Sequence, residues 1–116
     1  LYRALDELGA RALAAVRHHP VFLKPHVPDE DEALATYLLR EHAISAEEAA
    51  SEGYSLNVAA RELGFVFHPA RRVLSTRAAF AAIAVAARDG RGEALFEELS
   101  RAYFELGEDI SRLDVL

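Results

Sequence analysis

Hydrophobic residues recur at helical spacing along most of the chain, which predicts a mainly α-helical protein. The first short helix carries its apolar residues three and four positions apart and can end at Gly9. These apolar residues are Leu1, Leu5 and Leu8. Residues 15–23 break the period. Because they are rich in β-branched and aromatic side chains and include Pro20, they predict an edge strand rather than a helix that continues to Arg17.

Two further helices are predicted from capping boxes, in which an Asp or Ser is followed by a Glu three residues later. The two pairs are Asp29 with Glu32 and Ser45 with Glu48. The first of these helices, over residues 31–42, should bury Leu34, Tyr37 and Leu38. Gly64 should end the second, and Gly53 inside it permits a kink or a break. Its apolar face is predicted to hold Ala49, Leu56, Ala60 and Leu63.

Residues 65–74 form a predicted extended connection, after which Ser75 is expected to cap a helix over residues 76–90. That helix is apolar almost all round, so it should be the central one. Its bulky residues are Phe80, Ile83 and Val85. Three small residues, Ala79, Ala82 and Ala86, leave a smooth side on which another helix can pack closely.

The last long helix is predicted to begin at Glu93, with Phe104 on the side opposite to its main apolar stripe. The stripe holds Leu95, Leu99, Ala102 and Leu106, widened by Phe96 and Tyr103. A helix that is apolar on two sides is expected to be packed on two sides. Gly107 can end it and let Ile110 turn inward. The predicted architecture is therefore an N-terminal helix and a strand, followed by an antiparallel bundle of about four helices.

Composition and charge narrow the class of protein. The chain has 116 residues and 52% hydrophobic content, which suits one small folded domain and excludes disorder. A formal net charge of −6 leaves no broad positive field, so nucleic acid is not an expected partner. No apolar run is long enough to span a membrane. The chain has no Cys, hence no disulfide or zinc–thiolate site. It also has no Met and begins within a helical pattern, which predicts that it is a piece of a longer protein.

Few side chains suggest chemistry. His18 and His19 are neighbours that would point to opposite faces of a strand, so no metal site is expected, and no cofactor either.

Five acidic residues lie mostly on the polar side of the last helix, where solvation is the expected role: Glu97, Glu98, Glu105, Glu108 and Asp109. Three arginines around a helix start could attract an anion, the alternative being ordinary surface positions: Arg71, Arg72 and Arg77. Ser75 lacks a nucleophile elbow. Residue types alone therefore predict a helical module for packing or recognition.

Three stretches carry a family resemblance: "VRHHPVFLKP", "ELGFVFHPARRVLSTRAAF" and "LFEELSRAYFELGEDISRLDVL". In this order they resemble the second strand, the entry to the central helix and the end of the helical insertion in the FrnE-like branch of the DsbA family, which has a thioredoxin fold. The third stretch is the most specific. Two departures fall in the second, with Ser75 where the family usually has Asn and Phe80 where it often has His. Thr76, Arg77 and Ala79 are consistent with the pattern.

The resemblance implies that residues 1–25 are the end of a helix and a strand of the thioredoxin-like part, residues 26–110 the helical insertion, and residues 111–116 the return. The family's Cys-x-x-Cys pair would precede Leu1, so this chain would have no catalytic residue. The substrate-cleft candidates are Pro25, Ser75, Thr76 and Arg77. The candidates for packing between domains are Phe22, Tyr103, Phe104 and Ile110. Expected partners are a thiol or disulfide substrate and the thioredoxin-like body, with a homodimer as an option and a cytoplasmic location favoured.

Two other hypotheses stay open. The 2-hydroxychromene-2-carboxylate isomerases and kappa-class glutathione transferases use a similar insertion with a Ser in place of the redox cysteines, although "RAYFELGEDI" favours the FrnE-like branch. The third hypothesis is a non-catalytic helical module that binds a partner or pairs with itself. The residues before Leu1 would separate the two enzyme hypotheses, and cooperative unfolding of the isolated chain would favour the module.

Overall fold

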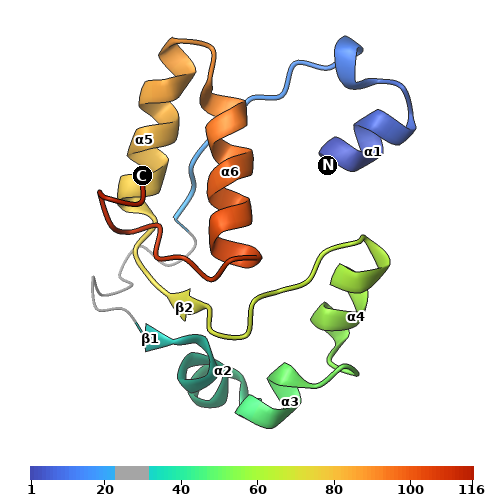
Figure 1. Cartoon of the computed structure of the whole chain (residues 1–116), viewed down its shortest axis with the longest axis vertical. Helices are drawn as coiled ribbons and strands as arrows, with labels where there is room; N and C mark the ends of the chain where they lie inside the picture. Colours follow the sequence, from blue (N-terminus) through green and yellow to red (C-terminus); the bar gives the residue numbers. More distant parts are fainter. Residues whose placement is uncertain (23–31) are drawn as a thin grey trace.

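The computed structural model describes residues 1–22 and 32–116 (Figure 1). This part of the chain is mainly helical, as the hydrophobic spacing predicts, and contains a small two-stranded antiparallel sheet. The helices are α1 (Tyr2–Glu7), the short 3-10 helix η1 (Arg11–Leu13), α2 (Leu34–His42), α3 (Ala46–Ala50), α4 (Ser55–Glu62), α5 (Arg77–Arg88) and α6 (Gly92–Phe104). The strands are β1 (Glu32–Ala33) and β2 (Arg72–Val73). None of the helices described has the length and apolar character needed to cross a membrane.

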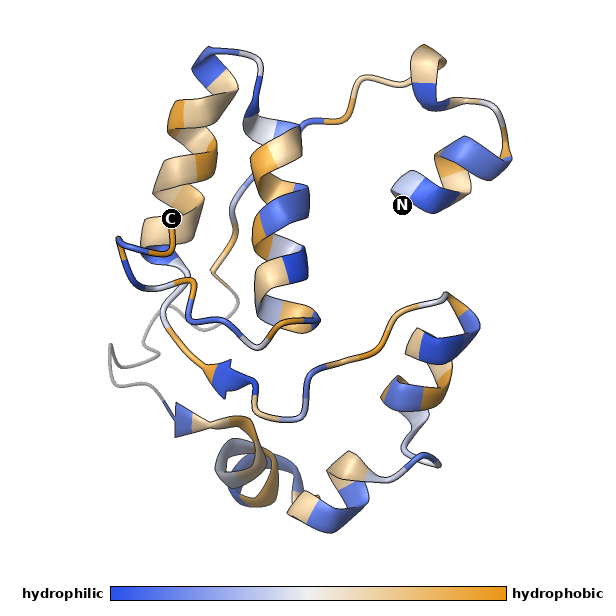
Figure 2. Cartoon of the chain, in the orientation of Figure 1, coloured by the Kyte–Doolittle hydropathy of each residue, from blue (hydrophilic) through white to orange (hydrophobic). Residues whose placement is uncertain are grey.

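The helical hairpin of α5 and α6 holds the core, and the two helices lie side by side in Figure 1. Its buried residues are Leu74, Ala79, Leu99 and Ile110. Ala79 is only 2% exposed, and its small side chain lets α6 pack closely, as the alanine-rich side of α5 predicts. The turn into α6 is equally tight, because a Cβ at Gly92 would lie 2.8 Å from Cβ of Ala87. Figure 2 shows α5 hydrophobic on nearly every turn, whereas α6 also carries hydrophilic residues.

The sheet joins α2 to the segment that precedes α5. Glu32 pairs with Val73 and Ala33 with Arg72, and the amide of Leu34 donates to the carbonyl of Arg71 at 3.1 Å. Glu32 is therefore a strand residue, and the predicted capping box is wrong at this position. Helix α2 begins after Ala33 without a side-chain cap, and Asp29, the other half of the predicted box, lies outside the described residues.

The Ser45 cap is confirmed, because its Oγ accepts a hydrogen bond from the amide of Glu48 at 3.0 Å. The helix that follows is interrupted, however, and residues 51–54 separate α3 from α4. Gly53, the predicted point of a kink or break, lies within this interruption. Gly64 follows α4 with φ +79°, a conformation that favours glycine, so the predicted end of this region is also confirmed.

Two further predictions are wrong, one about a strand and one about a helix cap. Residues 15–22 have no regular secondary structure, whereas an edge strand was expected there, and Leu23 lies outside the described part. A strand needs a partner, and the described sheet contains only β1 and β2; the side chains of His18 and Phe22 pack against helices instead. Ser75 is not the cap of the central helix. The N-cap residue of α5 is Thr76, and no side chain caps that end.

Some predicted apolar faces remain open to solvent. Ala60 of α4 is buried at 5% exposure, but Leu56 and Leu63 on the same predicted face are more than half exposed. Val85 and Leu106 are also exposed. In Figure 1, α4 lies away from the α5–α6 hairpin, so the core does not cover Leu56 and Leu63. Helical period thus predicts which residues share a face but not whether another element covers it.

Candidate functional site

The predicted substrate-cleft residues lie at and just before the start of α5. They are Ser75, Thr76 and Arg77. The guanidinium of Arg77 lies 5.4 Å from the ring centre of Phe22, and this ring lies 5.5 Å from that of Phe80. The fold therefore brings together Arg77, a predicted cleft residue, and Phe22, a predicted packing residue, on the side of α5. The fourth cleft candidate, Pro25, falls outside the described residues.

The predicted packing residues differ in their exposure to solvent. Ile110 is 8% exposed and belongs to the core of this chain. Tyr103 is half-buried, and its hydroxyl donates to the carbonyl of Arg72 at 2.6 Å. Phe104 is 41% exposed and Phe22 is 43% exposed. Phe104 and Phe22 therefore keep the apolar area that contact with a second body would need.

Phe104 is contacted by the connection between α4 and β2. The amide of His68 donates to the carbonyl of Phe104 at 2.7 Å, and the rings of Phe67 and Phe104 lie 5.7 Å apart. The guanidinium of Arg71 lies 4.4 Å from the centre of the Phe67 ring, and its Nε donates to the carbonyl of His68 at 3.0 Å. The end of α6 is thus fixed by one segment while part of the Phe104 ring stays open.

A groove of about 770 Å³ lies on that open side, between α1 and α6, and is called here the α1–α6 groove. Its apolar lining comes from the N-terminus, from the end of α4 with the segment after it, and from α6: Leu1, Leu63, Phe65, Phe67, Phe96 and Phe104. Charged residues also line it: Arg3, Glu7, Glu62, Glu97, Arg101 and Glu105. This combination of apolar surface with charged groups suits an extended, partly apolar ligand.

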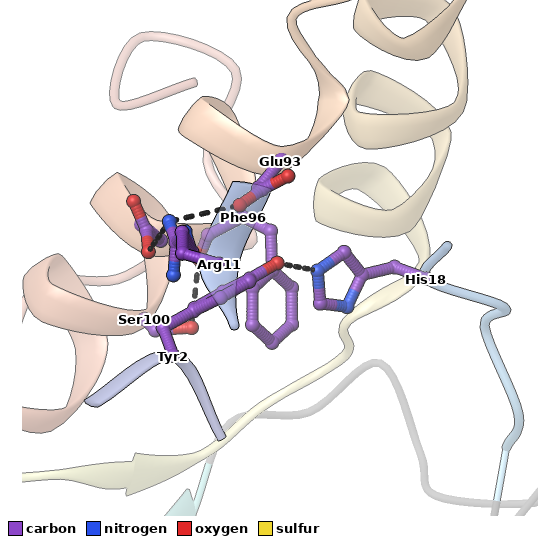
Figure 3. Close-up of polar contacts among 7 residues, drawn as sticks. Tyr2, Arg11, His18, Glu93, Phe96 and Ser100 are labelled. Carbon is purple, nitrogen blue, oxygen red and sulfur yellow. Dashed lines mark hydrogen bonds and ion pairs between the residues drawn. The ribbon is translucent and has the colours of Figure 1, made fainter. Parts of the chain in front are cut away.

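A cluster of rings beside the groove attaches α1 to α6 (Figure 3). The ring of His18 stacks on that of Phe96 at 3.9 Å, and its Nε2 is hydrogen-bonded to the hydroxyl of Tyr2. Burial, helped by the negative charges of Glu93 and Glu97, raises the pKa of Tyr2 above its ordinary value. The phenolic O–H is the donor of this hydrogen bond in the tautomer in which Nε2 of His18 is the acceptor.

Arg11 completes this attachment. Its guanidinium lies 3.9 Å from the centre of the Tyr2 ring and forms ion pairs with Glu93 at 2.9 Å and with Glu97 at 3.2 Å. Figure 3 shows Arg11 between the acidic side chains of α6 and the ring of Tyr2. Ser100 Oγ donates to the carbonyl of Phe96 at 2.7 Å, so it serves its own helix. These contacts position α1 along one edge of the groove.

The described residues were also compared with the pattern that a metal site needs. Within residues 1–22 and 32–116, no three His, Asp or Glu side chains come together as metal ligands would. The acidic residues Glu93 and Glu97 pair with Arg11, so Glu97 is a structural partner as well as a residue of the polar side. Comparison with family models, with curated proteins and with solved structures found no match for this chain.

The sequence alone missed two features of the site. The sequence predicts that His18 lies on an edge strand, whereas its ring joins Tyr2 to Phe96. Arg71 was treated as one of three similar arginines, whereas it is half-buried on Phe67. The available signal for Arg71 was a cation four residues after the apolar run Phe65–Val66–Phe67, which is close enough in the chain for its side chain to reach back to the Phe67 ring. No local signal connects His18 with a helix almost 80 residues later, because that contact exists only in the folded chain.

Proposed function

We propose that this chain is part of a DsbA-like thiol–disulfide oxidoreductase and supplies the helical wall of its substrate cleft. In this proposal residues 26–110 are the helical insertion, an antiparallel helical bundle, and residues 1–25 and 111–116 belong to the thioredoxin-like part. The chain contains no Cys, so the exchange of thiols and disulfides would take place on that part of the parent protein.

The observation that carries the proposal is the exposed ring of Phe104 in the α1–α6 groove. Helix α6 packs on α5 through Leu99, and Phe104 presents apolar surface on another side. The groove is bounded by α1, the segment that the resemblance assigns to the thioredoxin-like part. A groove between a thioredoxin-like helix and a helical insertion is the expected position of the cleft, so its presence supports the proposal.

The small core supports the same idea. Five apolar residues are buried in the described part, whereas several large ones stay exposed. Those near the groove include Leu1 at 76% and Leu63 at 55%. Apolar surface gathered around one hollow is typical of a protein contact. A substrate held in this groove, with the thioredoxin-like body along its rim, would give these side chains the cover that the described part of the chain does not provide.

The first experiment determines the coding sequence upstream of Leu1. A Cys-x-x-Cys pair at the start of the helix would support the oxidoreductase, and the purified parent should then reduce a protein disulfide such as that of insulin. Phe104→Ala should raise KM for the protein substrate several-fold, about 1 kcal/mol of lost contact, with little change in kcat. Leu113→Ala is the control, because Leu113 is 84% exposed and absent from the groove lining.

Other outcomes would replace the proposal. A single Ser at the helix start, with glutathione-dependent isomerase activity in the parent, would favour the isomerase hypothesis. An open reading frame that begins at this segment, together with cooperative thermal unfolding of the isolated chain at micromolar concentration, would favour a non-catalytic interaction module. A parent with Cys-x-x-Cys in which Phe104→Ala leaves KM unchanged would remove the cleft role while keeping the enzyme class.

A further inference from the structure

A second hollow lies among α2, α3, α4 and the segment that leads to β2, away from the Tyr2–His18 cluster. It has a volume of about 360 Å³ and is called here the α2–α4 pocket. Each of these elements contributes apolar side chains: Leu34, Leu38, Ala46, Ala49, Leu56, Phe65, Val66 and Phe67. Small-molecule pockets commonly measure roughly 300–1,000 Å³, so this hollow has the size for a compact ligand.

The charge of the pocket differs from that of the chain. The protein has 19 acidic and 13 basic residues. The described residues that line the pocket nevertheless include Arg61 and Arg71 and no Asp or Glu. The other polar side chains of the lining are Ser51, Tyr54 and Asn57. The pocket therefore combines apolar walls with positive charge, which complements a ligand that has an apolar body and an anionic end.

Most polar groups of the pocket already have partners. The side-chain amide of Asn57 donates to the carbonyls of Ala49 at 2.9 Å and Ser51 at 3.0 Å, which completes the end of α3. Arg61 donates to the carbonyl of Glu52. These two side chains hold α3 and α4 in place around the pocket and have less capacity for a ligand.

Arg71 still has hydrogen-bond donors that a ligand could use. Its Nε donates to the carbonyl of His68 and one face of its guanidinium lies over Phe67. In the described part of the chain, its two terminal amino groups have no hydrogen bond and no carboxylate partner. Burial lowers the pKa of Arg71 below its ordinary value, and an arginine keeps its charge at neutral pH. A bound carboxylate would compensate this partly buried charge with a two-pronged hydrogen bond.

We propose that the α2–α4 pocket binds a small amphipathic carboxylate, with its carboxylate at Arg71 and its apolar chain against Leu34, Leu38 and Leu56. The proposal does not depend on the redox function, because it concerns a pocket within the helical part and requires no thioredoxin-like body. Phe65 and Phe67 line both this pocket and the α1–α6 groove, so they form the wall between the two hollows.

Isothermal titration calorimetry of the full chain with decanoate tests the proposal. Decanamide, which has the same chain without the charge, should bind about tenfold more weakly or worse, and so should acetate, which has the charge without the chain. Saturable binding of decanoate with both differences is the expected result. Equal binding of decanoate and decanamide, or no binding of decanoate, would overturn the proposal.

Three variants locate the site. Arg71→Gln should weaken decanoate binding about tenfold, and Arg71→Lys should lose less because it keeps the charge. Ala49→Leu fills the pocket while leaving every contact of Arg71 in place, and it should also weaken binding about tenfold. Arg88→Gln removes an exposed positive charge on α5 and is the matched control, with binding unchanged. Far-ultraviolet circular dichroism confirms that each variant is folded. If Ala49→Leu binds decanoate like the unchanged chain, the pocket is not the site.

Discussion

Gly107 lies directly against the imidazole ring of His68, so closely that a Cβ at position 107 would stand 2.8 Å from Cγ of the ring. Gly107 also has φ +69°, a conformation that L side chains rarely adopt. On the same side, the amide of His68 donates to the carbonyl of Phe104. The end of α6 and the connection after α4 can meet only because position 107 has no side chain.

Gly107→Ala should therefore destabilise the chain through two separate effects. Gly90→Ala is the matched control, because Gly90 has φ +72° and an added Cβ there would meet nothing within 4 Å. The control should lose about 1–2 kcal/mol for the backbone conformation alone. Gly107→Ala should lose about 1–3 kcal/mol more through overlap with His68. Urea unfolding measures both.

The added variant His68→Ala tests the cause of that extra loss. In the Gly107→Ala background it removes the ring with which the new Cβ would overlap, so the two changes should be strongly non-additive. If Gly107→Ala and Gly90→Ala cost the same, the close contact between the ring and position 107 does not exist in solution.

Leu99→Ala should be one of the most damaging core substitutions. Leu99 is 6% exposed and packs with Leu74, Ala79 and Ile110 between α5 and α6. Its truncation should cost about 2–5 kcal/mol, because the surrounding helices cannot fully close the cavity. Leu113→Ala, at an 84% exposed position, should stay within about 0.5 kcal/mol of the unchanged chain. Thermal unfolding that gave equal shifts for the two variants would contradict the position of the core.

Tyr103→Phe should change stability in a manner that depends on pH. Burial raises the pKa of Tyr103 above its ordinary value of 10.0, so the folded chain retains the phenolic proton where the unfolded chain begins to lose it. This stabilisation is fully present below pH 10.0 and is lost as the pH rises from there through the raised pKa. Near neutral pH, Tyr103→Phe should cost about 1 kcal/mol, because the hydrogen bond to Arg72 is removed.

Unfolding measurements above pH 10.0 separate the two effects of that substitution. The free energy of unfolding should fall less steeply with pH in Tyr103→Phe than in the unchanged chain. The free energy of unfolding of Tyr103→Phe should still fall somewhat with pH, because burial also raises the pKa of Tyr2. Identical slopes in the two proteins would show that the Tyr103 hydroxyl is not buried as described.

Arg11→Gln should loosen α1 without unfolding the core. Arg11 pairs with Glu93 and Glu97 and covers the ring of Tyr2. Because the charged groups are partly exposed, the melting temperature should change little. Amide hydrogen exchange in α1 should become faster, and high salt should have a similar effect on the unchanged chain. Arg112→Gln, which breaks a pair with Asp114 instead, should leave exchange in α1 unchanged.

Local signals predicted the helical segments well where they act within a few residues. Ser45 caps α3 through Glu48, the turn at Gly64 has the positive φ that glycine tolerates, and α6 begins within one residue of the predicted Glu93. The same logic failed at Glu32, which pairs with Val73 in the sheet. A capping box and a strand pair compete for the same residue, and Val73 lies 41 positions after Glu32 in the sequence, so local spacing could not decide between them.

The candidate sites depended on long-range contacts to a larger extent. Helical spacing placed Phe104 apart from the main stripe, and its ring does remain partly exposed in the groove. The predicted cleft residues Ser75, Thr76 and Arg77 line neither of the two hollows, although Arg77 does lie against Phe22. Their role in a substrate cleft stays a prediction.

The sequence by itself determined the class of the fold, the helical segments of the C-terminal half and the absence of cysteine chemistry, because composition and periodicity are properties of neighbouring residues. Only the tertiary structure decided that Arg71 faces an apolar pocket, that Tyr2 reaches His18, and that Leu56 and Leu63 lack cover. These outcomes depend on which elements meet in space. The free energy of burial is shared among residues far apart in the chain, so no local pattern contains it.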